Sequence, residues 1–325
     1  MTETADLRVL AAGKTDAGRV RDHNEDCVLV APDLGLFVVA DGMGGHASGQ
    51  ISSAAAVASM HNFFEAMPSG TPTTGAPEDE PPRLVKAIRK ANRDLFEISA
   101  KHPEHRGMGS TVVALHLEGR TATLAHVGDS RCYRLRDGAI AQLTGDHSLR
   151  AEALRARPNL DPGALAALPK NVITRALGTR ESVEVDVQRL ALEPGDLLLL
   201  CSDGLHGMID DETIAAAAAV HDDLAEACDL LVALAIDAGG SDNVSVVMLG
   251  VGVQPAEAGE AVSVEATVEL VDDALAQFEG VLPAEELEQL RRGELVDVSA
   301  RRCGACGRRI VEGNQFCTEC GGRVA

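Results

Sequence analysis

The chain has 325 residues, which is enough for one large domain and a smaller one. Its 50 acidic and 29 basic residues give a net charge of -21, and aromatic residues make up only 2%, so nucleic acid is a poor partner: phosphates would be repelled and few rings could stack on bases. No stretch is apolar over the 18 or so residues that cross a bilayer, and the N-terminus lacks a signal-peptide pattern, so we expect a cytoplasmic protein with no membrane contact.

The first half of the chain alternates strand-like runs with two helical stretches. A Pro- and Gly-rich loop at 68–82 separates the helices, and tight turns between the later strands favour antiparallel pairing. We expect strands at 8–12, 27–31, 36–40, 111–117, 121–127, 132–135 and 140–143, and helices at 47–67 and 84–98.

The second half repeats this arrangement after an irregular stretch. Residues 148–180 are interrupted by prolines and resemble an inserted flap. Strands are expected at 183–190, 196–201 and 243–251, with helices at 211–220 and 222–238. The order of elements predicts an α+β fold in which two antiparallel sheets have helices packed outside them.

Five aspartates lie where an apolar strand meets a turn. An ionised carboxylate beside a dry core is costly unless it is paired, and no run of Lys or Arg accompanies these residues. Each could be an ordinary Asp-Gly-type turn, but five such positions in one chain favour a site for Mg²⁺ or Mn²⁺, which prefer oxygen ligands. The five are Asp26, Asp41, Asp129, Asp203 and Asp242.

Short motifs around these acids closely resemble those of the bacterial type 2C metal-dependent serine/threonine phosphatases. Any one motif would be weak evidence, but eight in order over about residues 7 to 253 are specific. They lie at 15–26 (TDAGRVRDHNED), 41–46 (DGMGGH), 107–111 (GMGST), 127–131 (VGDSR), 146–148 (DHS), 173–178 (ITRALG), 201–205 (CSDGL) and 242–243 (DN).

The resemblance implies an α-β-β-α sandwich with two Mn²⁺ or Mg²⁺ ions in a cleft between the sheets. By motif position, Asp41 would bridge both metals and Gly42 would offer its carbonyl to one of them. Asp203 and Asp242 would complete the other site. A hydroxide bridging the metals would then attack the phosphorus of phosphoserine or phosphothreonine.

The remaining acids have weaker implied roles. Asp26, with Glu25 beside it, would act mainly through metal-bound water, and Asp129 would share a third, weaker metal with Asp203. Arg21 matches the position of the family's phosphate-clamping arginine, and its planar guanidinium suits bidentate contact with phosphate. The alternative for Arg21 is a surface ion pair with a neighbouring acid, Asp22 or Glu25.

Two histidines stand beside these motifs. His46 is a candidate proton donor to the leaving serine or threonine oxygen, or else a residue that orients water beside the metals. His147 lies at the start of the flap, and there we favour a structural role in holding it.

Four cysteines near the C-terminus have metal-ligand spacing. Cys303, Cys306, Cys317 and Cys320 form C-x2-C-x10-C-x2-C, which favours one structural Zn²⁺ in a zinc ribbon over disulfides. Arginines make this segment basic, so it could dock to a protein partner or back onto the phosphatase, or simply form a soluble surface.

A segment of different composition precedes the ribbon. Residues 254–300 contain twelve acids against two arginines and supply about half of the net charge. We expect a flexible acidic linker, with either transient amphipathic helices or plain disorder. The expected domains are a phosphatase domain at 1–253, the linker at 254–300 and the zinc ribbon at 301–325.

Together these features predict a protein phosphatase that reverses bacterial Ser/Thr kinase signalling. Its partners would be phosphorylated proteins, meaning such kinases and their substrates. One alternative is a phosphatase dedicated to a single regulator, such as an anti-sigma-factor antagonist. The other is a non-catalytic scaffold that binds phosphoproteins and acts through the ribbon, although the complete set of acids argues against lost activity.

Overall fold

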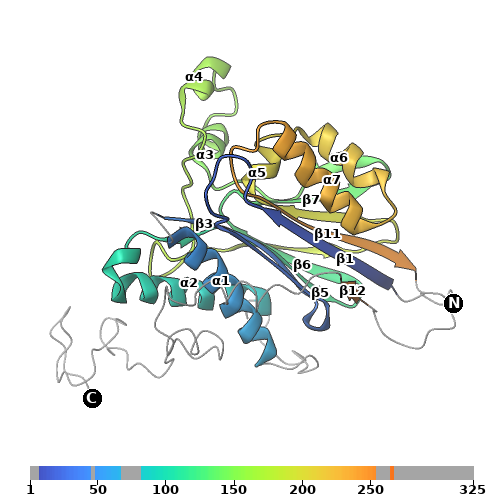
Figure 1. Cartoon of the computed structure of the whole chain (residues 1–325), viewed down its shortest axis with the longest axis horizontal. Coiled ribbons are helices and arrows are strands. Elements are labelled where there is room, and N and C mark those ends of the chain that lie inside the picture. Colours follow the sequence, from blue (N-terminus) through green and yellow to red (C-terminus); the bar gives the residue numbers. More distant parts are fainter. Residues whose placement is uncertain (1–6, 45–47, 67–81, 254–263, 267–325) are drawn as a thin grey trace.

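Two six-membered sheet layers form the centre of the fold in a computed structural model that describes residues 7–44, 48–66, 82–253 and 264–266 (Figure 1). The first sheet has the order β12 (Val264–Ala266), β1 (Leu7–Asp16), β11 (Val244–Val253), β10 (Leu197–Cys201), β7 (Arg131–Arg136) and β8 (Ala139–Gln142). The second has the order β2 (Asp26–Ala31), β3 (Leu36–Met43), β5 (Val112–Glu118), β6 (Thr121–Val127) and β9 (Asp186–Ala191), with β4 (Gly109–Ser110) paired to β3.

Helices cover the outer face of each sheet. The helices α1 (Ser48–Glu65) and α2 (Arg83–Lys101) pack against the second sheet, and α6 (Asp211–Val220) and α7 (Leu224–Asp237) against the first (Figure 1). A third apolar cluster, which includes Phe37, Leu115, Leu200 and Leu249, fills the space between the sheets. The predicted sandwich of two sheets with helices outside is confirmed.

Among the described residues, no helix is long and apolar enough to span a membrane.

The β2–β3 hairpin brings two acids together. All six residues of β2 are buried, as expected for a strand between a helix layer and a second sheet. The turn is a short 3-10 helix, η1 (Pro32–Leu34), ended by Gly35 with a φ of 61°. The register then pairs Ala31 with Leu36 at one end and Asp26 with Asp41 at the other.

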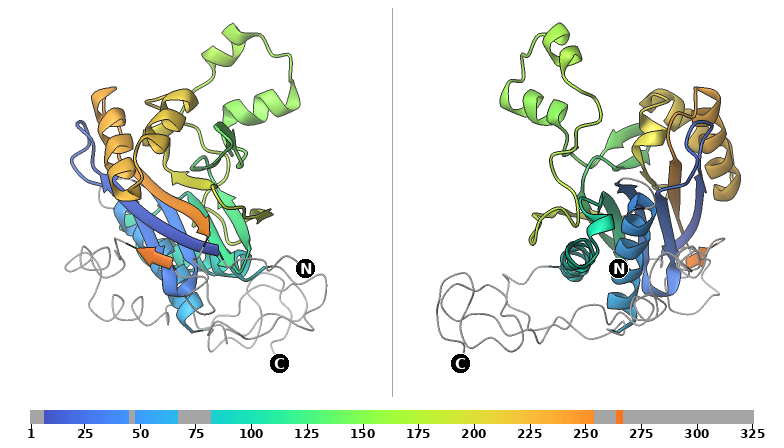
Figure 2. Two further views of the ribbon diagram at one scale, coloured as in Figure 1. Left: turned by 90° about the vertical axis from the view of Figure 1, so that its right-hand side faces the viewer. Right: turned by 60° about the vertical axis from the view of Figure 1, so that its left-hand side comes forward.

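The irregular stretch after β8 stands away from the sandwich (Figure 2). It contains α3 (Leu149–Ala156) and α4 (Pro162–Ala167), whose N-termini are capped by the side chains of Ser148 and Asp161. Arg150 joins the two helices by donating to the backbone oxygens of Ala166 and Leu168. The predicted flap therefore has its own internal structure.

Several element boundaries differ from the sequence prediction. The strand expected at 183–190 corresponds to β9, which begins only at Asp186. Val183 and Val185 instead pack into the apolar cluster beneath α1 and α2. The four-residue α5 (Asp203–His206) and the 3-10 helix η2 (Pro103–His105) are too short to leave a periodic signal. β12 pairs with β1 in parallel, unlike the other pairs of either sheet.

Candidate metal centre

Five carboxylates converge on one end of the sandwich. Asp26 and Asp41 face each other across β2 and β3, Asp129 follows β6, Asp203 opens α5 after β10, and Asp242 precedes β11. Burial, followed by the charges of the other four, holds the pKa of Asp41 well above its usual range. The structure thus brings together all five aspartates that the sequence singled out.

The carboxylate of Asp26 is fixed by hydroxyl groups from the opposite sheet. The Ser202 hydroxyl donates to Asp26 Oδ2 over 2.8 Å, and Ser245 also hydrogen-bonds this side chain. The other oxygen, Oδ1, is buried and has no partner among the described residues, and the same holds for Oδ1 of Asp129. A buried carboxylate oxygen without a donor is costly, so both atoms fit ligands of a cation or of its bound water.

The electrostatics of the cluster also fit the binding of a cation. Burial and then the charges of Asp203 and Asp242 raise the pKa of Asp26 to about 7, despite the Ser245 and Ser202 hydrogen bonds. Burial and the neighbouring Asp203 raise the pKa of Asp129 to about 7. Burial and Asp242 raise the pKa of Asp203 to about 6. Without cations these groups therefore resist ionisation, because each additional charge is repelled by its neighbours.

Backbone hydrogen bonds fix the strand end that carries Asp41. Its N–H donates to Thr111 Oγ1 over 3.1 Å, and its carbonyl accepts from the Thr111 N–H over 2.8 Å and the Ser110 hydroxyl over 3.1 Å. Thr111 is held in turn by the Ser130 hydroxyl at 2.7 Å. Thr111 was not predicted as a site residue, since nothing in the local pattern shows which loop lies beside Asp41.

Gly42 lies where a side chain cannot fit. Its N–H donates to the Glu25 carbonyl over 3.0 Å. A Cβ at this position would lie 1.9 Å from the Gly49 carbonyl oxygen and 2.6 Å from that of Glu25. The Gly49 N–H, in the first turn of α1, bonds the Glu25 carboxylate, whose pKa is nevertheless raised, mainly by burial. Gly42 and Glu25 are thus packed together.

Arg21 reaches the edge of the cluster. Its Nη2 atom lies 2.9 Å from Asp242 Oδ2, and 47% of its side chain is exposed. Burial lowers its pKa, but the charges of Asp242, Glu25 and Asp41 more than offset this and raise it. The alternative, an ion pair of Arg21 with Asp22 or Glu25, is wrong. Arg21 pairs instead with Asp242, which is more than two hundred residues away in sequence.

Asn243 is a residue that the sequence prediction did not assign to the site. Its side-chain oxygen accepts from the Glu25 N–H over 2.8 Å, and its amide donates to the carbonyls of Ala17 and His23, both over 2.9 Å. These three bonds attach the loop that carries Arg21 to the start of β11. The Asp-Asn motif pointed to this position, but only the folded chain shows what the amide holds.

Five of the predicted site residues lie in parts of the chain that the structure does not describe. These are His46 and the four zinc-ligand candidates, Cys303, Cys306, Cys317 and Cys320. The four cysteines in the described part of the chain, Cys27, Cys132, Cys201 and Cys228, are buried and unpaired, as expected for core residues.

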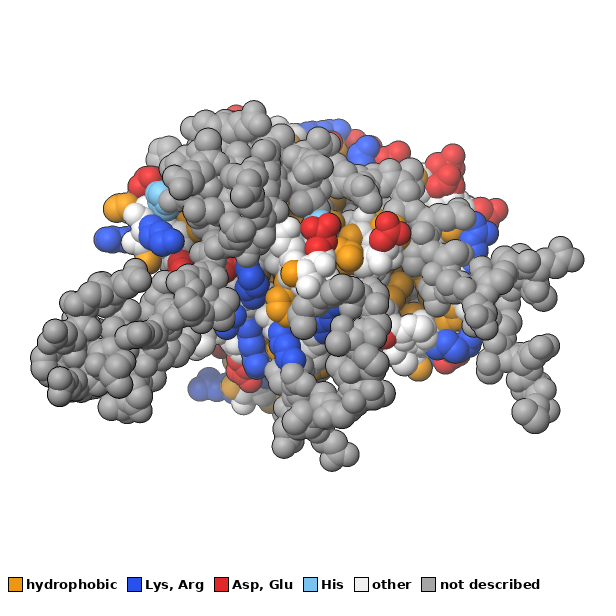
Figure 3. Space-filling view, turned by 90° about the horizontal axis from the view of Figure 1, so that it is seen from below, with side chains coloured by type: hydrophobic (Ala, Val, Ile, Leu, Met, Phe, Trp, Pro, Cys, Tyr) orange, Lys and Arg blue, Asp and Glu red, His pale blue; other side chains and the backbone are white. Residues whose placement is uncertain are grey.

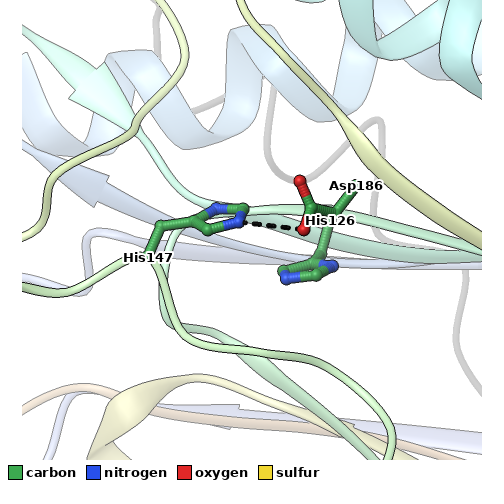
Figure 4. A group of neighbouring side chains, drawn as sticks. All are labelled: His126, His147 and Asp186. Carbon is green, nitrogen blue, oxygen red and sulfur yellow. Dashed lines mark ion pairs between the residues drawn. The ribbon is translucent and has the colours of Figure 1, made fainter. Parts of the chain in front are cut away.

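A cluster of histidines anchors the flap (Figure 4). The rings of His126 and His147 are stacked at 4.8 Å, and His147 Nε2 lies 3.4 Å from Asp186 Oδ2. Arg175 holds the other oxygen of Asp186 at 2.5 Å. Since His147 and Arg175 lie at the two ends of the flap, and Asp186 lies on β9, this network ties the flap to the sheet.

The side chains of His126, His147 and Asp186 offer metal-ligand atoms that all lie within 4.8 Å of one another. The Gly128 N–H, however, donates to His147 Nδ1 over 3.0 Å, which puts the proton of the neutral ring on Nε2. Burial and the charge of Arg175 keep the pKa of His147 below its usual range. Nε2 therefore carries the proton and lies beside Asp186 without meeting hydrogen-bond geometry. Because a protonated nitrogen does not ligate a metal, we interpret the group as a structural anchor.

The sandwich, the acid cluster and the exposed arginine beside it define a metal-dependent phosphatase. The chain belongs to the protein phosphatase 2C family, whose model matches residues 19–232. It is 36% identical to the serine/threonine phosphatase Stp of Listeria monocytogenes over 239 residues, which cover 73% of this chain and 93% of that protein. The chain is a metal-dependent serine/threonine protein phosphatase, as the motifs implied.

Mycobacterial relatives agree in sequence and in structure. The chain is 36% identical to the serine/threonine protein phosphatase PstP of Mycobacterium tuberculosis over 241 residues, covering 74% of this chain and 44% of PstP. A crystal structure of the PstP catalytic domain in complex with two manganese ions superposes with a TM-score of 0.66, at 34% identity, covering 76% of this chain and 99% of that one. The crystal structure of the phosphatase MsPP from Mycobacterium smegmatis, with cacodylate, has a TM-score of 0.62 at 35% identity, covering 74% and 97%.

We expect the stabilisation of the protein by Mn²⁺ to fall as the pH falls. A carboxyl whose pKa is raised on folding stabilises the metal-free protein below its unfolded pKa, and this contribution is lost as the pH rises through about 6 to 7. At pH 8 the repulsion is therefore unrelieved, and saturating Mn²⁺ should raise the melting temperature by about 5 to 10 °C. At pH 5.5 protons compete for the same oxygens and the rise should be at most half as large.

Calorimetry of Asp203→Asn provides the matched test. At pH 8 without metal this variant should melt above the native protein, because one buried charge is removed, and it should lose most of the Mn²⁺ response. Asp33→Asn, in the exposed turn at the far end of the β2–β3 hairpin, should behave like the native protein. Equal Mn²⁺ shifts at the two pH values would contradict the proposed ligands.

We also expect His147→Ala to loosen the flap without unfolding the sandwich. The change removes the acceptor for the Gly128 N–H and the ring nitrogen that lies beside Asp186, a loss of about 1 to 3 kcal/mol. Limited trypsin digestion should cut faster at the flap residues Arg150, Arg155 and Lys170, whereas His147→Gln, which keeps an acceptor and a donor, should be partly protected. His61→Ala on α1 serves as the control, and unchanged flap cleavage in His147→Ala would exclude the anchor.

Proposed function

We propose that this phosphatase holds two Mn²⁺ or Mg²⁺ ions between its sheets. Asp41 would bridge them, with the Gly42 carbonyl on one ion and with Asp203 and Asp242 on the other. The single observation that best supports a cation here is the buried, partnerless carboxylate oxygen of Asp26 in a group of mutually repelling acids. The two manganese ions of the PstP catalytic domain support the number.

Further acids would serve these ions less directly. Glu25 and Asp26 would act through bound water, since the Asp26 carboxylate is already engaged by hydroxyl donors on one side. Asp129 would share a third, weaker ion with Asp203; its own partnerless oxygen and the effect of Asp203 on its pKa support this pairing.

The ions would neutralise the phosphate ester and lower the pKa of the attacking water. The residues of the chain then bind and orient the substrate. Arg21 is the exposed positive group at the acid cluster, and we propose that it leaves its pair with Asp242 to bind two phosphate oxygens. Asn243 would keep Arg21 in place by holding the backbone on both sides of it.

The leaving serine or threonine oxygen needs a proton when its bond to phosphorus breaks. We propose His46 for this role, or for the orientation of water beside the ions, because a histidine can donate near neutral pH and this one follows the Asp41 motif closely in sequence. His206 is a poor alternative, since burial, followed by the charge of Arg131, lowers its pKa to about 4.

We propose that the substrates are phosphorylated Ser/Thr kinases and their targets, in the cytoplasm. The four buried free cysteines support a reducing compartment, and the names of the relatives support protein substrates in general. A phosphatase dedicated to one regulator, such as an anti-sigma-factor antagonist, has the same site, so only the range of accepted phosphoproteins separates the two. A non-catalytic scaffold is disfavoured by the complete acid cluster.

Activity assays test the catalytic proposal. With p-nitrophenyl phosphate and a phosphothreonine peptide, we expect turnover with Mn²⁺, none after chelation, and recovery when Mn²⁺ is restored. Asp41→Asn and Asp203→Asn should lower kcat by about 10³-fold or more, and Arg21→Ala should lower kcat/KM by about 10- to 100-fold. Asp33→Asn should be fully active; metal-independent turnover, or an active Asp203→Asn, would refute the mechanism.

We propose that residues 301–325 form a zinc ribbon after an acidic linker at 254–300, so that residues 1–253 are the phosphatase domain. Full-length protein purified without added metal should contain one zinc per chain, and Cys303→Ser/Cys306→Ser should contain none, because two thiolates cannot hold a structural zinc. Cys228→Ala is the control: burial raises the pKa of this thiol to about 12, so it should not ligate zinc. Zinc retained by the double variant would reject the assignment.

A further inference from the structure

The outer face of α2 carries a row of positive charges. Lys86, Arg89, Lys90 and Arg93 recur every three or four residues and so lie on one side of the helix. The opposite side, which includes Leu84, Ile88 and Leu95, is buried against the second sheet. We call these four residues the basic face; in the view from below, Lys and Arg side chains gather on the side of the molecule formed by α1 and α2 (Figure 3).

Part of this charge has no use within the described fold. Lys90 Nζ lies 2.6 Å from Asp94 Oδ2, whose side chain is only 1% exposed, so Lys90 is needed to compensate a buried acid. Arg89 is exposed and Arg93 partly exposed, and neither makes an ion pair with a described residue, although the charge of Arg93 also acts to lower the pKa of Asp94. In a chain with a net charge of -21, two such arginines on one helix face favour an acidic ligand.

The same chain supplies an acidic segment that can reach this face. Residues 267–300 carry nine acids and two arginines, with acids adjacent at 272–273 and 285–286. After β12 the stretch 267–300 can extend roughly 110 Å, whereas the radius of gyration of a domain of this size is about 18 Å. A tethered segment is also present at an effective concentration on the order of millimolar, so weak surface ion pairs are sufficient to hold it.

We propose that the basic face of α2 is a docking surface for the acidic segment 267–300 of the same chain. The binding would be electrostatic and reversible. It would place the C-terminal cysteines beside the helix layer of α1 and α2, on the side of the sandwich opposite α6 and α7. The proposal does not depend on the metal mechanism, because none of the four basic residues belongs to the acid cluster.

Carbodiimide cross-linking of the full-length protein tests this directly. The reagent couples a lysine amine to a carboxylate only when the two are close enough to form an ion pair. At about 50 mM salt we expect Lys86 to couple to peptides from 267–300, as read by mass spectrometry. At 0.5 M NaCl, where the screening length is about 4 Å, the yield should fall about tenfold.

Charge reversal on the helix supplies the specific control. Arg89→Glu/Arg93→Glu should reduce the Lys86 cross-links about tenfold at low salt, while activity on p-nitrophenyl phosphate stays unchanged. Arg157→Glu/Lys170→Glu makes the same change of charge at two exposed flap residues and should leave these cross-links intact. Lys14 is the internal reference, since it pairs with Asp229 on the other side of the sandwich.

Three results would overturn the proposal. One is the absence of cross-links between Lys86 and 267–300. Another is unspecific attraction, which would appear as coupling of 267–300 to Lys14 as strong as its coupling to Lys86. Coupling to Lys86 that Arg89→Glu/Arg93→Glu does not reduce would mean the same. The third is coupling only between isotopically distinct copies in a mixed sample, which would assign the face to the tail of a second chain.

Discussion

The mutual repulsion of buried carboxylates is the constraint around which this fold is organised. The β2–β3 register places Asp26 opposite Asp41, and the other sheet adds Asp203 and Asp242 at the same end. An apolar core that includes Phe37 holds the two sheets together immediately behind them. The acids therefore cannot move apart without opening the core, and their repulsion is relieved only by protons or by cations. Bound cations at such a site would therefore be expected to stabilise the fold.

Close packing explains two of the glycines beside the cluster, Gly42 and Gly204. A Cβ on Gly42 would meet the Gly49 carbonyl at 1.9 Å, and one on Gly204 would meet the Asn243 carbonyl at 1.8 Å. Asn243 uses its side chain for three further bonds to the Arg21 loop. The same residue thus packs against the turn that carries Asp203 and fixes the loop that carries Arg21, so it would couple the proposed metal site to the proposed phosphate-binding residue.

Local sequence patterns were enough to predict most elements and the acids, and insufficient for what depends on pairing. The sequence pattern predicted β6 and α6 with their observed bounds. β6 is a run that follows a turn and is buried at every position after the first, and α6 buries one helical face. The five aspartates stood out since each lies where an apolar strand meets a turn. Neither the ion pair of Arg21 with Asp242 nor the bonds of Asn243 could be derived, because their partners are distant in sequence. The start of β9 was predicted too early because Val185 is apolar, although its side chain packs in the cluster beneath α1 and α2 and not in the strand.

The charge distribution suggests that substrate recognition is local. The whole chain is strongly acidic, yet a phosphorylated side chain is an anion, and long-range attraction cannot bring the two together. At physiological ionic strength charges are screened beyond about 8 Å, so the groups within that distance of the phosphate decide its binding. Arg21, nearly half exposed at the edge of the acid cluster, would be such a group, together with bound cations. If the acidic segment 267–300 is held on the basic face of α2, it would compete less with a phosphate for those positive groups than a segment that is free to reach the acid cluster.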